Sequence, residues 1–282
     1  MQNVIILGSG RSGTSMVAGL FRHSEMFQGK EMLPATISNP LGYYEDKHLN
    51  LLNNALIEQM LRWPTLNRLR TRLSWPAHTD PRCYWLAAPK WLRTPKLTDE
   101  QKQLMAWYGK QEPFCYKDPR FNVTLHLWRE FLPETTRYLV IFREPDKTVD
   151  SILRDAHELY QPPLPITEKW GYHMWYRTYD RLLKERAGDP HWMFIHYGQV
   201  QSLEAIPAIE AFLGVKIDAA NINPGISRSQ LRTNHGLSIA RKCDDLYDLL
   251  CLRAECDVSA WLPKRPSSTK SSDAWLLRSK SA

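Results

Sequence analysis

The segment GSGRSGTS, residues 8–15, holds residue types that bind phosphate groups. It follows the apolar run NVIIL, which predicts a short buried strand ending at the glycines. Glycines permit a tight turn, and backbone N–H groups at the start of a following helix attract an anion. Gly8 and Gly13 have the spacing of the triphosphate-binding pattern GxxxxGK[ST], but Thr14 stands where that pattern requires lysine. The segment therefore predicts a phosphate site whose cation, Arg11, comes from inside the loop.

A second phosphate-binding pattern lies in IFREPDKTVDS, where Arg143 ends an apolar run and Ser151 follows eight residues later. The run predicts another buried strand, and Pro145 suits the first turn of a helix after it. Two helical turns would bring Ser151 back toward the strand end. Its hydroxyl and the forked guanidinium of Arg143 can then bind one phosphate. Taken alone, Arg143 is also compatible with a surface salt bridge.

Together the two motifs resemble the cofactor site of sulfotransferases that use 3'-phosphoadenosine 5'-phosphosulfate (PAPS). In that family a basic residue followed by Ser-Gly-Thr binds the 5'-phosphosulfate, and RSGTS matches from Arg11 onward. An arginine and a serine eight residues apart bind the 3'-phosphate, a role that the resemblance gives to Arg143 and Ser151. Three further segments are similar to bacterial members of the family, namely NPLGYYED (39–46), KDPR (117–120) and AFLGV (211–215).

The resemblance implies a role for each matched residue. Arg11 would neutralise charge on the leaving 5'-phosphate, as an electrostatic stabiliser rather than a proton donor. Lys117 is similar to lysines that approach the sulfuryl group in glycan-sulfating members. The Arg-Lys-Gly loop of the cytosolic members is absent as a motif, and Arg228 or Arg232 in SRSQLRTNH is the expected substitute. The remaining cofactor-binding residues implied are those of the loop, namely Gly10, Ser12, Gly13, Thr14 and Ser15.

Transfer of a sulfuryl group also requires a general base for the acceptor's proton, and members of the family use histidine or glutamate. Glu45 in GYYED is the preferred candidate, because its aromatic neighbours can partly bury the carboxylate. Glu31, twenty residues after Arg11, is the alternative, since it lies near the base of tyrosylprotein-sulfating members. His48, one helical turn from Glu45, is a weaker third candidate. Each glutamate is also compatible with an ordinary surface charge, and Glu45 with the start of a helix.

The elements that must position these residues are alternating strands and helices. Strands are predicted at 4–7, before KDPR, at 137–142 and at 191–197. Helices are predicted after residue 13 and at 45–60, 125–132, 145–156, 167–186, 207–213 and 243–255. This alternation predicts an α/β fold, P-loop-like and three-layered, with a central, mainly parallel sheet flanked by helices. The motifs would meet at the carboxyl ends of its strands, where such sheets bind ligands.

Composition, net charge and cysteine content limit the classes of protein to which the chain can belong. The 282-residue chain is 43% hydrophobic and 24% charged, which is ordinary for a globular protein. The resemblance implies one sulfotransferase domain over 1–262, and the Ser- and Lys-rich composition of 263–282 predicts a loose tail. A net charge of +7 suits an anionic ligand, but its thin spread argues against nucleic acid. Five cysteines without a CxxC pair argue against disulfides and zinc. Without a signal peptide or long apolar window, we expect a cytoplasmic protein that does not contact membranes.

The sequence and the resemblance together predict a bacterial-type, PAPS-dependent sulfotransferase. It would transfer a sulfuryl group in line, without a metal, to a hydroxyl or amine of a small natural product or carbohydrate, and release 3'-phosphoadenosine 5'-phosphate. One alternative is a P-loop-type small-molecule kinase, against which the missing lysine argues. Another is a non-catalytic member that binds a nucleotide. The oligomeric state is not predicted.

Overall fold

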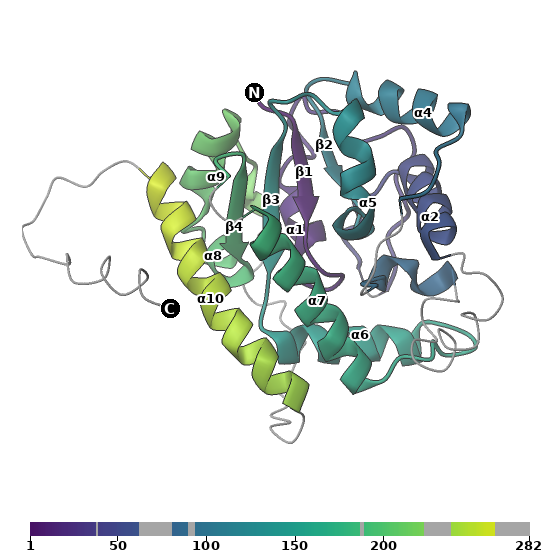
Figure 1. Ribbon diagram of the computed structural model, residues 1–282. Helices are drawn as coiled ribbons and strands as arrows, with labels where there is room; N and C mark the ends of the chain where they lie inside the picture. Colours follow the sequence, from purple (N-terminus) through teal and green to yellow (C-terminus); the bar gives the residue numbers. More distant parts are fainter. Residues whose placement is uncertain (38, 62–80, 90–93, 187–188, 223–237, 263–282) are drawn as a thin grey trace, which may run out of the picture.

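The centre of the molecule is a four-stranded parallel sheet in the order β2-β1-β3-β4. The computed structural model describes residues 1–37, 39–61, 81–89, 94–186, 189–222 and 238–262 (Figure 1). Its strands are β1 (Val4–Leu7), β2 (Cys115–Lys117), β3 (Arg137–Phe142) and β4 (Trp192–His196). Because β1 lies between β2 and β3, the loop that follows it leaves the middle of the sheet.

Helices connect the strands and cover both faces of the sheet. In chain order they are α1 (Thr14–Gly19), α2 (Lys47–Leu61), η2 (Pro81–Leu86), α4 (Asp99–Gly109), α5 (Phe121–Trp128), η3 (Arg129–Phe131), α6 (Pro145–Glu158), α7 (Glu168–Arg186), α8 (Tyr197–Gln201), α9 (Ile206–Leu213), η4 (Ala219–Asn221) and α10 (Ser238–Trp261). Figure 1 shows α10 running along the outer edge of the sheet beside β4.

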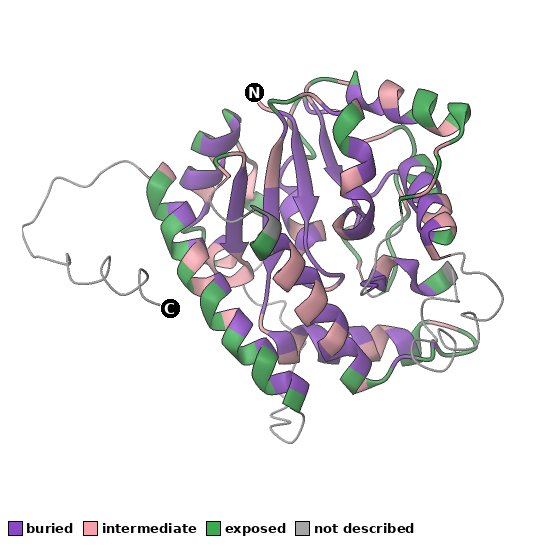
Figure 2. Ribbon diagram, viewed as in Figure 1, coloured by how far each residue is buried: buried purple, intermediate pink, exposed green. Residues whose placement is uncertain are grey.

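Alternate residues of the strands face two separate apolar cores. Ile5 and Leu7 belong to the core shared with α2, α5, α7 and most of α10. Val4 and Ile6 point to the other side, where α1 and α9 pack. The strands are therefore buried on both faces, which explains their uninterrupted apolar runs (Figure 2). This arrangement confirms the predicted three-layer α/β fold with a parallel sheet.

Several helices differ from the sequence prediction. The helix expected at 125–132 is α5, Phe121–Trp128, and the 3-10 turn η3 follows it. The helix expected at 243–255 extends over Ser238–Trp261, because its apolar stripe continues to Val258. The helix Asp99–Gly109 was not expected at all: its first five residues, DEQKQ, are polar, and its apolar residues follow only in the second half. A capping box does mark its start: the Thr98 hydroxyl accepts from the Gln101 N–H at 3.2 Å, and the Gln101 side-chain oxygen accepts from the Thr98 N–H at 3.0 Å.

The start of α2 decides where Glu45 lies. The helix begins at Lys47, two residues later than expected, because Asp46 caps it by accepting a hydrogen bond from the Leu49 N–H at 2.8 Å. Glu45 thus precedes the cap and belongs to the approach to the helix. Nowhere in the described part of the chain is a helix long and apolar enough to cross a membrane. The predicted tail, 263–282, lies outside the described residues.

Candidate active site

The loop after β1 is anchored at its first residue. Gly8 has a φ of 139°, and a Cβ there would lie 2.2 Å from the Ile141 carbonyl oxygen, so only glycine fits. The side-chain amide of Asn122 on α5 donates to the Gly8 carbonyl at 2.7 Å and accepts from the Gly8 N–H at 3.0 Å. The entry to the loop is therefore fixed by the neighbouring helix.

Two buried hydroxyls hold the next turn of the loop. The Tyr179 hydroxyl accepts from the Ser9 N–H at 3.1 Å and donates to the Ile141 carbonyl at 2.8 Å. The Ser12 hydroxyl donates to the Ser9 carbonyl at 2.6 Å and is fully buried. In this conformation the Ser12 side chain shapes the loop from inside, which differs from the expectation that its hydroxyl contacts a phosphate. The Ser15 hydroxyl lies farther out and accepts from Lys117 at 3.0 Å.

Two aromatic rings that the sequence did not single out pack on the loop glycines. A Cβ on Gly10 would lie 2.3 Å from the Trp85 ring, and one on Gly13 would lie 2.3 Å from the Tyr197 ring. The guanidinium of Arg143 lies over the same Tyr197 ring, 4.8 Å from its centre. Tyr197 directly follows β4, so its place at a strand end was a usable signal, whereas Trp85 lies in a segment without a readable pattern.

Arg11 connects the loop to α6. Its backbone has a φ of 68°, unusual for a residue with a side chain, and its Nε donates to the Ser151 hydroxyl at 3.0 Å. The same Nε lies 3.2 Å from a carboxylate oxygen of Asp155, one helical turn beyond Ser151. Burial raises the pKa of Asp155, although the charge of Arg11 opposes this. The two predicted phosphate motifs are therefore in direct contact.

Arg143 lies at the carboxyl end of β3, on the same edge of the sheet as the loop. Its side chain is 9% exposed, and its Nε lies 3.8 Å from Glu144. Its carbonyl accepts a hydrogen bond from the Trp175 indole at 3.2 Å, which fixes the backbone where α6 begins. The structure thus brings Arg11, Arg143 and Ser151 to one edge of the sheet.

A buried ion pair flanks the loop on the β2 side. The Lys117 ammonium lies 2.5 Å from a Glu45 carboxylate oxygen, and these side chains are only 3% and 7% exposed. The second Glu45 oxygen accepts from Asn50 at 2.9 Å and lies 3.7 Å from the Arg120 guanidinium. Because Lys117 also donates to Ser15, the pair contacts the loop directly. Two residues that are 72 positions apart in the sequence are thus brought together.

A second ion pair, between Arg120 and Asp118, lies next to the Lys117–Glu45 pair. Arg120 donates to Asp118 at 3.0 Å, and Asn53 on α2 donates to the other Asp118 oxygen at 2.9 Å. Asp118 is 1% exposed. Of the segment KDPR, Lys117 therefore points toward the loop, while Asp118 and Arg120 pair with each other behind the Lys117–Glu45 pair.

The alternative bases lie at the surface. The Glu31 and His48 side chains are 50% and 48% exposed, with 3.4 Å between the Glu31 oxygen and the His48 Nε2. Lys47 donates to the other Glu31 oxygen at 2.7 Å, and this hydrogen bond lowers the pKa of Glu31. An exposed carboxylate with a lowered pKa is a weak proton acceptor. The expected 3'-phosphate residues Arg228 and Arg232 lie within 223–237, outside the described residues.

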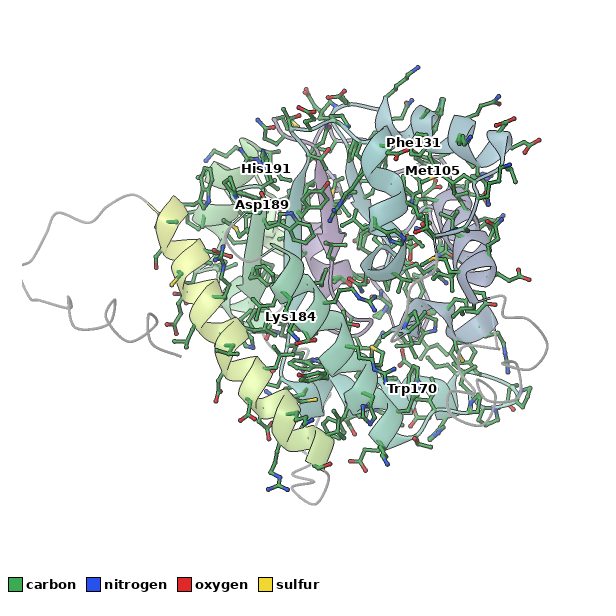
Figure 3. The ribbon with its side chains drawn as sticks, viewed as in Figure 1. Met105, Phe131, Trp170, Lys184, Asp189 and His191 are labelled. Carbon is green, nitrogen blue, oxygen red and sulfur yellow. The ribbon has the colours of Figure 1, made fainter. Side chains whose placement is uncertain are left out.

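The opposite edge of the sheet holds none of these residues. Asp189 and His191 lie at the amino end of β4, whereas Trp170 lies at the far end of the molecule (Figure 3). A shallow hollow at the amino-terminal edge is lined by Glu134, Tyr138 and His191, among others. The charged residues gathered around the loop therefore form the candidate active site.

Comparison with known proteins concerns the chain as a whole rather than these individual residues. Residues 3–219 match the sequence profile described as the sulfotransferase family. A solved structure, the sulfotransferase domain from the curacin biosynthetic pathway, is similar over 89% of this chain and 97% of that domain, with 14% identity and a TM-score of 0.50. At that identity the likeness concerns the fold. The sulfotransferase domain from the Synechococcus PCC 7002 olefin synthase has 17% identity over 94% of this chain and 98% of that domain, with a TM-score of 0.43. A search of curated proteins finds no match.

Proposed function

Since the chain belongs to the sulfotransferase family, we propose that it transfers a sulfuryl group from PAPS to a hydroxyl or amine of a small natural product or carbohydrate. The observation that carries the choice of donor is the contact between the two phosphate motifs. Arg11 of the loop lies 3.0 Å from Ser151, and Arg143 begins the segment that carries Ser151. A donor with phosphates at its 5' and 3' positions suits two adjacent cationic motifs.

The residues divide into two binding groups. Arg11, Lys117 and the backbone N–H groups of the loop would hold the 5'-phosphosulfate, because they lie around one turn of chain. Arg143 and Ser151 would hold the 3'-phosphate, with Arg143 supported by the Tyr197 ring. Arginine suits this role because its planar fork binds phosphate through two parallel hydrogen bonds.

PAPS supplies the sulfuryl group, and 3'-phosphoadenosine 5'-phosphate is released. In the transfer, Arg11 and Lys117 place positive charge where negative charge develops on the leaving phosphate and the sulfuryl oxygens. We assign the acceptor's proton to Glu45, which is buried beside Lys117, rather than to the exposed Glu31. Glu45→Gln should then abolish transfer and leave nucleotide binding intact.

A second candidate function is nucleotide binding without transfer. It is favoured by the pairing of Glu45, since one oxygen contacts Lys117 and the other contacts Asn50. A carboxylate with a partner on each oxygen already has a structural role in the ion pair and does not require one in proton transfer. If transfer does occur, and is retained in Glu45→Gln but lost in Glu31→Gln, the general base is Glu31 rather than Glu45.

The donor assignment is tested by isothermal titration of 3'-phosphoadenosine 5'-phosphate and of AMP. Arg143→Ala should weaken binding of the bisphosphate by about 1.5–3 kcal/mol, the worth of a hydrogen bond to a charged group, and leave AMP binding unchanged. Arg22→Ala, which removes an exposed arginine just after α1, is the control and should bind like the wild type. An unchanged dissociation constant in Arg143→Ala would overturn the assignment.

A further inference from the structure

Asp155 is a carboxylate beside the loop that has no part in the transfer just described. Its side chain is 14% exposed, and one oxygen lies 3.2 Å from the Arg11 Nε. The same Nε donates to the Ser151 hydroxyl at 3.0 Å. Since Ser151 and Asp155 are four residues apart on α6, they present side chains to Arg11 from one helix face.

The contact places a negative charge on the cation that the donor needs. Arg11 is the loop's own cation, and its side chain is 22% exposed, so solvent screens the ion pair only partly. A carboxylate at 3.2 Å neutralises much of the guanidinium charge that an approaching anion would meet. A 5'-phosphate near Arg11 would also be repelled by the like charge of Asp155.

Building on the proposed function, we infer that Asp155 is a positioning residue that competes with the donor's 5'-phosphate for Arg11. Between turnovers it holds Arg11 against α6 beside Ser151. It thereby lowers the affinity for the 5'-phosphate of the donor and of the released bisphosphate alike. Weaker binding of the product favours its release, a step that limits turnover in many enzymes.

Asp155 is one of several carboxylates on α6, and the competition for Arg11 is assigned to it alone. Glu158 lies within electrostatic range of Asp155 but is exposed at the end of the helix. Asp150 pairs with Arg154 at 3.1 Å instead of with the loop. Glu158→Gln is therefore a matched control, because it removes the same charge from the same helix without touching Arg11.

The test is the dissociation constant of 3'-phosphoadenosine 5'-phosphate for the wild type, Asp155→Asn and Glu158→Gln. Asp155→Asn should bind about tenfold more tightly, which corresponds to about 1.4 kcal/mol. Adenosine 3'-monophosphate, which lacks the 5'-phosphate, should bind the wild type and Asp155→Asn with equal affinity. Asp155→Ser, a second uncharged variant, should repeat the gain, whereas Glu158→Gln should not.

A double-mutant cycle identifies the partner. In an Arg11→Ala background, Asp155→Asn should tighten binding much less than it does in the wild-type background, because only the direct repulsion between Asp155 and the 5'-phosphate is then relieved. Unchanged or weaker binding in Asp155→Asn, or an equal gain in Glu158→Gln, would overturn the inference while leaving the donor assignment standing. If the wild type binds adenosine 3'-monophosphate and the bisphosphate no better than AMP, the proposed function itself falls, and the inference with it.

Discussion

Replacing Lys117 with methionine is the sharpest perturbation of the buried pair beside the loop. The Lys117 ammonium and the Glu45 carboxylate are 2.5 Å apart, with side chains 3% and 7% exposed. Methionine keeps the length of the side chain but removes its charge, so Glu45 is left as a buried carboxylate without its nearest cation. Breaking a buried ion pair from one side costs about 3–5 kcal/mol.

The remaining contacts of Glu45 indicate where in this energy range the loss of stability should lie. Glu45 keeps its hydrogen bond from Asn50 at 2.9 Å and the Arg120 guanidinium at 3.7 Å. These partners still offset part of the desolvation, so we expect Lys117→Met to lower the free energy of unfolding by about 3 kcal/mol, the low end of the range. In the double variant Glu45→Gln/Lys117→Met the charge is gone, and most of the lost stability should return.

Urea unfolding followed by tryptophan fluorescence measures this free energy, since the chain has eleven tryptophans. The midpoint should fall while the m value stays constant. Lys47→Met is the matched control: its pair with Glu31 is about half exposed on both sides, so its loss should cost less than about 1 kcal/mol. If Lys117→Met proves as stable as this control, the buried pair does not carry the charge that the geometry assigns to it.

Three other changes probe the rest of the edge. Gly10→Ala should weaken binding of 3'-phosphoadenosine 5'-phosphate, measured by titration, because its Cβ would meet the Trp85 ring at 2.3 Å. Tyr179→Phe should lower the free energy of unfolding in urea by about 1–3 kcal/mol, because the buried Ser9 N–H loses its acceptor, while the Ile141 carbonyl keeps the Ser12 hydroxyl at 3.2 Å. Burial lowers the pKa of His196, so the folded protein favours the neutral ring. Below about pH 6.5 the unfolded chain gains a proton on this histidine, and the free energy of unfolding should therefore fall as the pH drops. The melting temperature of His196→Gln should lack this part of the decline between pH 7.5 and 5.5; an equal decline in both proteins would assign it to other groups.

Most of the sheet and the position of the loop after β1 could be predicted from the sequence, because buried parallel strands are short apolar runs and the loop glycines follow one directly. Spacing along one helix also predicted that Ser151 returns toward the edge, where it contacts Arg11. By contrast, α4 begins with five polar residues, and its capping box is the clearest sign of its start.

The pairing of side chains was harder to predict than the elements. Lys117 reaches the loop because β2 pairs with β1 in the register Ile6 to Lys117, which no local pattern encodes. Trp85 contacts Gly10 from a segment without readable periodicity. The position of Asp155, four residues after Ser151, was visible as helical spacing, but its partner Arg11 depends on the loop conformation.

The most direct test of the central claim is the melting temperature with 3'-phosphoadenosine 5'-phosphate, with ADP, and with ATP plus magnesium. A ligand at about a hundred times its dissociation constant adds about 2.7 kcal/mol, which should raise the melting temperature by about 5 °C in a chain of this size. This rise is expected with the 3'-phosphorylated nucleotide, and little change is expected with ADP, because Arg143 and Ser151 are assigned to the 3'-phosphate. A rise with magnesium-ATP alone would contradict the account and indicate a kinase.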